Sequence, residues 1–212
     1  MTTVVLASAS QSRLRVLRQA GIDPQVTVSH LDEHALVASL DRDAPPESVV
    51  AKLANAKALT VAALLPEELI SDCVVIGCDS MLYLDGRMHG KPRTAEAARR
   101  QWEKMAGATG HLLTGHAILR LTAGVITHTE SDTGSTVVQF AQPSPIDLNR
   151  YLASDEPLNV AGAFTLDGIG GWFVKRIEGD PSNVIGLSLP LVQKLIRRTG
   201  LSISDLWATT ID

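Results

Sequence analysis

The pattern of hydrophobic and polar positions predicts short strands that alternate with helices. Short apolar runs at Val4–Ala7 and Cys73–Gly77 are typical of buried strands, and Gln25–Ser29 is a third predicted strand. Ser10 is a suitable N-cap for a first helix that ends at Gly21. The other predicted helices are one that opens at Pro45-Pro46-Glu47 and carries apolar residues up to Ala63, then Thr94–Met105, Pro145–Ala153 and Ser188–Arg198.

The pattern changes to strand in the second half of the chain. Leu112–Thr122, Val125–Asp132 and Thr136–Ala141 are predicted strands, with Gly124 and Gly134 at the turns between them. Ser80–Leu84 extends or re-enters the sheet before a hairpin-type turn at Asp85-Gly86, and Gly171–Ile177 is a last predicted strand. Residues 1–212 therefore predict a single mixed α/β domain.

Composition narrows the classes of protein that this chain can be. Its 212 residues are 45% hydrophobic and 20% charged, which is normal for a globular protein. The formal charge of −4 argues against a non-specific nucleic-acid binder. No apolar run approaches the ~20 residues that cross a bilayer, so no membrane is expected. The first residues lack the features of a signal peptide, and a cytoplasmic location is the expectation.

The two cysteines are not expected to form a disulfide. If Cys73 and Cys78 share one strand, five steps of ~3.3 Å place them roughly 16 Å apart, which is beyond bridging distance. Their spacing is not that of a zinc site either.

The segment from Ser8 to Arg13 is a candidate phosphate site. A strand that runs into a helix start leaves unpaired N–H groups, to which Ser8, Ser10 and Ser12 add hydroxyls and Arg13 a guanidinium. The alternative is simple capping by Ser10, with Arg13 on a solvated face. This segment alone favours neither interpretation.

Two acidic residues and two lysines make a second candidate site. Asp79 follows the apolar run Val74–Gly77, and Glu33 occupies a comparable place after another predicted strand. Either carboxylate could hold Mg²⁺ or accept a proton from water, and Lys57 and Lys91 could neutralise phosphate. The alternative is that Asp79 caps a turn and Lys91 is a surface lysine. No Walker A loop or dinucleotide fingerprint is present.

Taken together, the ordered motifs resemble those of the Maf family. The resemblance covers about residues 4 to 200, and its motifs are Leu6-Ala7-Ser8-Ala9-Ser10…Arg13, Asp32-Glu33, Leu53-Ala54…Lys57-Ala58, Gly77-Cys78-Asp79, Gly90-Lys91-Pro92, Thr114-Gly115, Ala161-Gly162-Ala163-Phe164 and Gly179-Asp180…Asn183-Val184-Ile185-Gly186-Leu187. It implies an inosine-triphosphatase-like mixed α/β sheet, with two lobes around a central cleft.

The resemblance also implies an activity and roles for individual residues. The activity is hydrolysis of a nucleoside triphosphate to the monophosphate and pyrophosphate with a divalent cation, Mg²⁺ or Mn²⁺. Asp79 matches the proposed proton acceptor and Glu33 the second acidic residue, and both are candidate metal ligands. The other matching residues are the triphosphate-facing cations Arg13, Lys57 and Lys91, the hydroxyls of Ser8 and Ser10, and Asp180 and Asn183 in a late motif.

Three positions differ from the best-known branches of the family. The pyrimidine-specific branch carries Arg, Thr and Gln where this chain has Ser12, Ser80 and Asp167, and the branch that acts on 7-methylguanosine triphosphate carries Trp, Gln and Glu. Because an acid at Asp167 could accept hydrogen bonds from the donor edge of a guanine-type base, we hypothesise a purine or modified-purine preference.

Two other functions remain open from the sequence. One is a non-catalytic regulator that senses nucleotides, because the family is also linked to septum formation and cell-division arrest as well as to house-cleaning of modified nucleotides. The other is a sugar-nucleotide transferase, which would need an acceptor pocket. The sequence does not determine the oligomeric state, and a homodimer is compatible with it.

Overall fold

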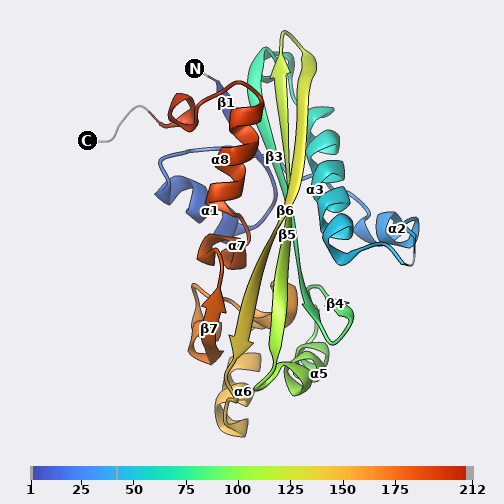
Figure 1. The fold of residues 1–212 in the computed structure, drawn as a ribbon, viewed down its shortest axis with the longest axis vertical. Coiled ribbons are helices and arrows are strands. Elements are labelled where there is room, and N and C mark those ends of the chain that lie inside the picture. Colours follow the sequence, from blue (N-terminus) through green and yellow to red (C-terminus); the bar gives the residue numbers. More distant parts are fainter. Residues whose placement is uncertain (1, 42, 209–212) are drawn as a thin grey trace. The chain divides into compact units, whose positions relative to one another are not determined.

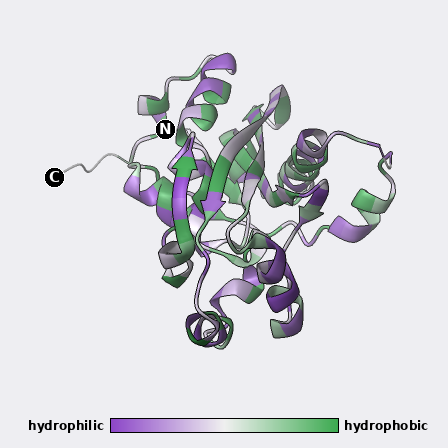
Figure 2. Cartoon of the chain, turned by 60° about the horizontal axis from the view of Figure 1, so that its bottom comes forward, coloured by the Kyte–Doolittle hydropathy of each residue, from purple (hydrophilic) through white to green (hydrophobic). Residues whose placement is uncertain are grey.

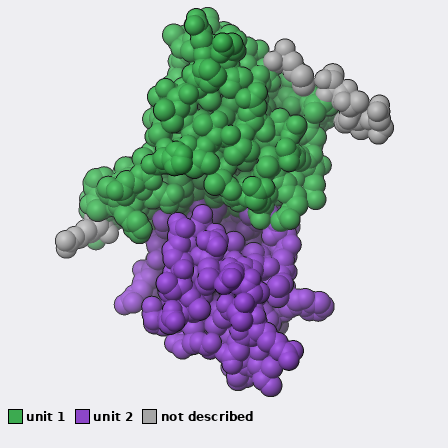
Figure 3. Space-filling view, turned by 180° about the vertical axis from the view of Figure 1, so that it is seen from behind, with its two compact units in different colours: residues 1–79, 114–134, 186–212 green, residues 80–113, 135–185 purple. Residues whose placement is uncertain are grey.

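The computed structural model describes residues 2–41 and 43–208. The chain forms two compact units, coloured separately in Figure 3. Unit 1 comprises residues 1–79, 114–134 and 186–212, and unit 2 comprises residues 80–113 and 135–185. The predicted mixed α/β fold with two lobes is confirmed.

A mixed sheet runs through the chain in the order β2-β1-β3-β5-β6-β7, with β4 paired to β3. In unit 1, β1 (Thr3–Ala7) pairs in parallel with β2 (Gln25–Val26) and with the start of β3 (Asp72–Leu84). β5 (Thr109–Thr122) and β6 (Val125–Phe140) are joined by a tight turn in which Ala123 and Gly124 both have positive φ. The strands β3, β5 and β6 each contribute residues to both units.

Helices cover both faces of the sheet in unit 1. Figure 1 shows α3 (Pro46–Ala62) on one face, with α1 (Gln11–Gln19) and α8 (Leu189–Arg198) on the other. These helices bury one face only: α8, for example, buries Leu195 and Ile196 and exposes Arg198. Both hydrophobic and hydrophilic residues therefore occur along most helices in Figure 2. Unit 1 also contains α2 (Glu33–Ala38), α4 (Glu67–Ile70) and the 3-10 turn η4 (Ile203–Leu206).

Glycine allows α3 to lie unusually close to the sheet. A Cβ atom on Gly77 of β3 would overlap the carbonyl oxygen of Ala54, and one on Gly115 of β5 would overlap that of Val50. Both carbonyls belong to α3, so the backbones of this helix and of the two strands are in direct contact. This contact fixes where side chains on α3 lie relative to the middle of β3.

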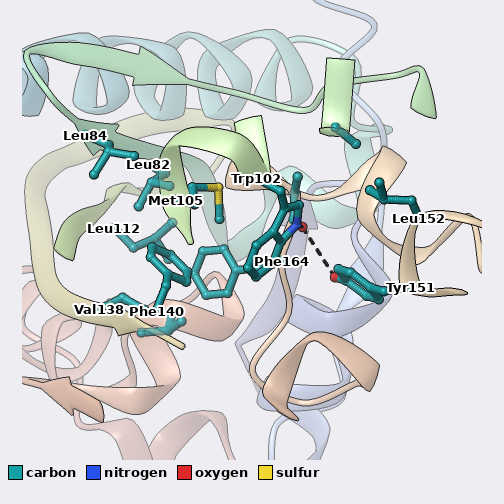
Figure 4. Close-up of a cluster of buried hydrophobic side chains, with 13 residues drawn as sticks. Leu82, Leu84, Trp102, Met105, Leu112, Val138, Phe140, Tyr151, Leu152 and Phe164 are labelled. Carbon is teal, nitrogen blue, oxygen red and sulfur yellow. Dashed lines mark hydrogen bonds between the residues drawn. The ribbon is translucent and has the colours of Figure 1, made fainter. Parts of the chain in front are cut away.

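Unit 2 is organised around an aromatic core. Trp102 of α5 (Ala95–Met105) makes edge-to-face contacts with Tyr151 of α6 (Pro145–Leu152) and with Phe140. Figure 4 shows Trp102, Phe140 and Tyr151 in this core, and the Trp102 indole N–H donates to the carbonyl oxygen of Ala163 at 2.8 Å. The other elements of unit 2 are β4 (Arg87–His89), η1 (Glu156–Asn159), η2 (Ala161–Ala163), η3 (Ile169–Phe173), β7 (Val174–Glu178) and α7 (Pro181–Ile185).

Several predicted boundaries were wrong. Gly134 is not a turn, because its φ is not positive and β6 continues through it as one strand. Of the predicted second strand only Gln25–Val26 forms β2, paired with Val5 and Leu6 of β1; a last backbone hydrogen bond runs from the Thr27 N–H to the Leu6 carbonyl at 3.1 Å, and Val28 and Ser29 lie beyond the strand. The last strand begins at Val174 instead of Gly171, because the preceding residues form the turn η3.

The two cysteines lie on β3, as predicted, and both are free thiols. Ser80–Leu84 continues β3 without a break. Across residues 2–41 and 43–208, no helix has the length and apolarity that a membrane span requires.

Candidate active site

Asp79 and Lys57 form a buried ion pair in unit 1. Asp79 is the last residue of β3 in that unit and is 6% exposed, whereas Lys57 projects from α3 and is 8% exposed. The Lys57 ammonium nitrogen lies 2.5 Å from Oδ1 of Asp79. Since Gly77 permits the close approach of α3, this pair depends directly on the helix–strand contact described above.

Glu33 contacts the same lysine from another element. It lies in the first turn of α2, where the side chain of Asp32 caps the helix by accepting from the Ala35 N–H at 2.9 Å. The Lys57 ammonium is 2.8 Å from Oε1 of Glu33, whose side chain is half exposed. Lys57 therefore bridges two carboxylates, one buried and one open to solvent.

The environment of Asp79 makes its carboxylate unusually basic. Burial raises the pKa of Asp79 above its ordinary value, against the opposing effect of the Lys57 and Arg13 charges, and the nearby Glu33 charge raises it further. Only Oδ1 is held by the lysine. Oδ2 is buried and has no hydrogen-bond partner among the described residues.

Arg13 is buried beside this pair and holds the backbone that carries it. Its Nη1 donates to the carbonyl oxygen of Cys78 at 2.9 Å and to the Ser8 hydroxyl at 3.0 Å, and its Nε donates to the carbonyl of Gly186 at 2.8 Å. Arg13 is thus no solvated surface residue. It fixes the strand end directly before Asp79 and also joins it to the segment that leads into α8.

The serines of the first segment have distinct local roles. Ser10 is the N-cap of α1, as predicted, and its hydroxyl accepts from the Arg13 N–H. Ser8 is buried and its hydroxyl accepts from the Ser10 N–H at 3.2 Å. Ser12 lies one helical turn before Arg15, whose guanidinium donates to it at 3.4 Å.

The other predicted site residues belong to unit 2. Ser80 directly follows Asp79 along β3, and Lys91 is exposed in the loop between β4 and α5. That loop is held by the Gly162 N–H, which donates to the Gly90 carbonyl at 3.2 Å. Asp167 is exposed in the loop before η3.

Asp180 and Asn183 stabilise the late motif. The Asp180 carboxylate accepts from the N–H and hydroxyl of Ser182 at the start of α7. Asn183 is 1% exposed, and its amide donates to the Leu112 carbonyl and to the Thr136 hydroxyl, both at 3.1 Å. These bonds tie α7 to β5 and β6 within unit 2.

The family model described as "Maf-like protein" matches residues 3–199. This range includes every helix and strand named above except the 3-10 turn η4. The chain belongs to this family. The resemblance based on the ordered motifs is therefore confirmed for nearly the full length.

Curated relatives match nearly the whole chain. A protein of Mycolicibacterium gilvum is 74% identical over 98% of this chain and 99% of its own length, and one of Rhodococcus opacus is 56% identical over 99% and 98%. Both carry the name nucleoside triphosphate pyrophosphatase. Among solved structures, the Staphylococcus aureus Ham1 protein is similar at a TM-score of 0.36 and 15% identity, over 66% of this chain and 72% of that one.

The donor set of the Maf-like site is compatible with a divalent cation. Glu33 and Asp79 offer carboxylate oxygens, which Mg²⁺ and Mn²⁺ prefer, and Oδ2 of Asp79 has no protein partner. In the described part of the chain, no group of three or more His, Cys, Asp or Glu side chains could hold a metal ion. Mg²⁺ is commonly bound by one or two carboxylates together with substrate phosphates, and these residues fit that arrangement.

Sequence reasoning missed two sets of contacts, one in each unit. The carbonyls of Cys78 and Gly186 accept from Arg13, and no side-chain pattern marks a backbone carbonyl as functional. Glu156, which binds the loop that carries Asp167, was also missed. Its only sequence signal is an acidic residue directly before a proline, which is too common to be informative.

Proposed function

We propose that this chain is a nucleoside triphosphate pyrophosphatase, a hydrolase of phosphorus-containing anhydrides that releases the nucleoside monophosphate and pyrophosphate. The observation that carries the proposal is the buried Asp79 carboxylate, which is held at one oxygen by Lys57 and has its other oxygen unpartnered. The names of the Maf-like relatives support the same activity.

Asp79 is proposed as the proton acceptor. A water attacks the α-phosphorus, its proton passes to Oδ2 of Asp79, and the bond from the α-phosphorus to the bridging oxygen breaks so that pyrophosphate leaves. The raised pKa of Asp79 suits this role, because a more basic carboxylate accepts a proton more readily. Lys57 keeps the carboxylate oriented through its bond to Oδ1.

Glu33 and Asp79 would hold a divalent cation, Mg²⁺ or Mn²⁺, with the phosphates of the substrate. When bound, the cation supplies positive charge that offsets the negative charge of the triphosphate and of the leaving pyrophosphate. Asp79 could then act as a ligand as well as a base. Lys57 and Lys91 are the proposed cations for the phosphates, with the hydroxyls of Ser8 and Ser10.

Arg13, Asp180 and Asn183 are proposed to act mainly by holding backbone segments in place. Arg13 bonds the carbonyl before Asp79, and the Asn183 amide donates to protein atoms on two strands. Ser12, Ser80 and Asp167 are the proposed base-selecting positions, and the acid at 167 favours a purine or modified purine.

The test is pyrophosphate release from 7-methylguanosine, guanosine, deoxythymidine and uridine triphosphates, with Mg²⁺, with Mn²⁺ and with a chelator. Metal-dependent release of pyrophosphate with an equal amount of monophosphate supports the proposal, and a clear pyrimidine preference would overturn the purine hypothesis. Binding of a triphosphate without any release would favour the nucleotide-sensing regulator instead.

A further inference from the structure

Glu156 forms three hydrogen bonds to the loop that carries Asp167. It is the first residue of η1 in unit 2, and its Oε1 accepts from the Thr165 hydroxyl at 2.6 Å and from the Gly170 N–H at 3.0 Å. Its Oε2 accepts from the Ile169 N–H at 3.0 Å. These donors lie on both sides of Asp167, so one carboxylate holds both ends of a short loop.

The three donors require a carboxylate in particular. Two are backbone N–H groups, one on each oxygen of Glu156, and an ionised carboxylate can accept at both oxygens. A glutamine would present its NH₂ group to one of the two N–H donors, whichever way its amide is turned. Hydrogen bonds to a charged acceptor are also roughly twice as strong as neutral ones.

The loop follows the carboxylate so closely that two of its positions have no room for a side chain. A Cβ atom on Gly168 would lie 2.6 Å from Oε2 of Glu156, and one on Gly170 would lie 2.6 Å from the Tyr151 hydroxyl. A side chain at Gly168 would therefore displace the Glu156 carboxylate, and one at Gly170 would overlap the Thr165 backbone nitrogen, also at 2.6 Å, as well as the Tyr151 hydroxyl.

Apolar packing holds the two flanks of this loop but not its tip, because Leu166 and Phe173 pack against the core of unit 2. Asp167, Gly168 and Ile169 are exposed, and Trp172 in the following turn is 85% exposed. With little apolar surface buried at its tip, the loop depends on polar contacts for a defined conformation. The bonds to Glu156 join Thr165, before the tip, to Ile169 and Gly170, after Asp167.

The residues around Glu156 belong to the core of unit 2. Tyr151 is buried against Trp102, and both side chains donate to the Ala163 carbonyl (Figure 4). Pro157, which follows Glu156, is also buried. Glu156 therefore connects an exposed loop to a rigid support.

We propose that Glu156 is a positioning residue that fixes the backbone on both sides of Asp167 and thereby determines how strongly the protein distinguishes one nucleoside base from another. The inference rests on the proposed function, in which Asp167 selects the base. Glu156 itself touches no substrate in this scheme and acts only through the loop.

The test compares base selectivity in Glu156→Gln and Asp167→Asn, singly and together. Dissociation constants for the monophosphates of 7-methylguanosine, guanosine, deoxythymidine and uridine are measured by calorimetry, because these compounds carry the bases but no anhydride bond. We expect Glu156→Gln to lower the ratio between the weakest and the tightest dissociation constant by roughly 3- to 30-fold. In the Asp167→Asn background it should change that ratio less than about twofold, as expected for residues that act as one unit.

A matched control is Asp147→Asn, an acid-to-amide change in the same unit at an exposed carboxylate that accepts from the Ser144 hydroxyl. It should leave the ratio unchanged. Thr165→Val removes one of the three donors and should shift the ratio in the same direction as Glu156→Gln, whereas Thr165→Ser keeps the hydroxyl and should retain wild-type selectivity. If Glu156→Gln does not fold, the comparison of Thr165→Val with Thr165→Ser still tests whether the bonds to Glu156 control base selectivity.

An unchanged ratio in folded Glu156→Gln, or an equal change in the Asp167→Asn background, would overturn the inference. The result is independent of the proposed activity, because monophosphate binding is measured without turnover. A protein that selects among monophosphates but releases no pyrophosphate from any triphosphate would contradict the activity and leave the role of Glu156 supported.

Discussion

The Lys57 ammonium lies 2.5 Å from Oδ1 of Asp79, and Oδ2 of the same buried carboxylate has no hydrogen-bond partner among the described residues. One oxygen is thus fixed by a cation, and the other is buried without a hydrogen-bond partner. This asymmetry depends on α3 lying against β3 at Gly77, because Lys57 and Asp79 are on these two elements. It links the packing of unit 1 to the activity that we propose.

Replacement of Asp79 by asparagine should remove activity while leaving the fold intact. The amide has the shape of the carboxylate but cannot accept the proton, so kcat should fall by roughly 10²- to 10⁴-fold. Steady-state pyrophosphate release measures this, and circular dichroism checks the fold. Asp85→Asn, at the exposed turn after β3, is the matched control and should retain wild-type kcat. Near-normal turnover in folded Asp79→Asn would exclude Asp79 as base and as metal ligand.

The pH dependence of kcat/KM should reflect the same group. Because burial raises the pKa of Asp79, the carboxylate becomes protonated at a higher pH than an ordinary aspartate with a pKa of 3.8. Activity should therefore decline on the acid side at a pH clearly above 3.8, and the residual activity of Asp79→Asn should lack this decline. A pH–rate profile of both proteins is the measurement. The same acid decline in both would assign it to another group.

Replacement of Lys57 by methionine should reduce both stability and activity. It keeps the length of the side chain but leaves the buried Asp79 carboxylate without its cation, which costs about 3–5 kcal/mol when one partner of a buried pair is removed. Urea unfolding at neutral pH measures the loss. Lys52→Met changes an exposed lysine on the same helix and should alter stability by less than about 0.5 kcal/mol. Equal stability of the two variants would show that the pair contributes little.

Replacement of Gly77 by alanine should destabilise the protein through direct overlap. The new Cβ would collide with the backbone carbonyl of Ala54 on α3, which cannot move away as a flexible side chain could. We expect a loss of about 1–3 kcal/mol in unfolding free energy, together with reduced activity as α3 shifts with Lys57. Gly90→Ala, where a Cβ would meet no atom within 4 Å, is the stability control. An unchanged unfolding midpoint for Gly77→Ala would contradict the close contact.

Acidic conditions should open the loop that Glu156 holds. Partial burial acts to raise the pKa of Glu156, but the hydrogen bonds from Thr165, Gly170 and Ile169 outweigh it and lower this pKa below 4.5. The stabilisation is therefore fully present above about pH 4.5 and is lost as the pH falls through the lower value in the folded protein. The neighbouring Tyr151 hydroxyl stays neutral in this range, because burial and the Glu156 charge raise its pKa.

Hydrogen exchange of the Ile169 and Gly170 amides, measured by NMR from pH 6 down to the onset of global acid unfolding and corrected for intrinsic rates, follows this opening. Protection should fall with pH in the wild type. In Glu156→Gln it should be low throughout and independent of pH. A wild-type protection that stays constant down to the pH at which the whole protein unfolds would rule out a contribution from Glu156 ionisation.

The sequence by itself determined the fold class and most of the elements. Hydrophobic runs followed by polar residues located β1 and the middle of β3, and the N-cap residue Ser10 marked the start of α1, because these signals are local. The ordered motifs also singled out Glu33, Lys57 and Asp79, which the structure brings together in unit 1.

Only the tertiary structure decided what these residues contact. Strand ends depend on pairing between distant segments, so the predicted strand Gln25–Ser29 extended past the end of β2, and a turn was predicted at Gly134 inside β6. Arg13 donates to two backbone carbonyls, and Glu156 accepts from two backbone N–H groups. The spacing of these residues along the chain shows no local pattern. Long-range polar contacts of this kind arise from how the chain is packed, and no periodicity of the sequence encodes them.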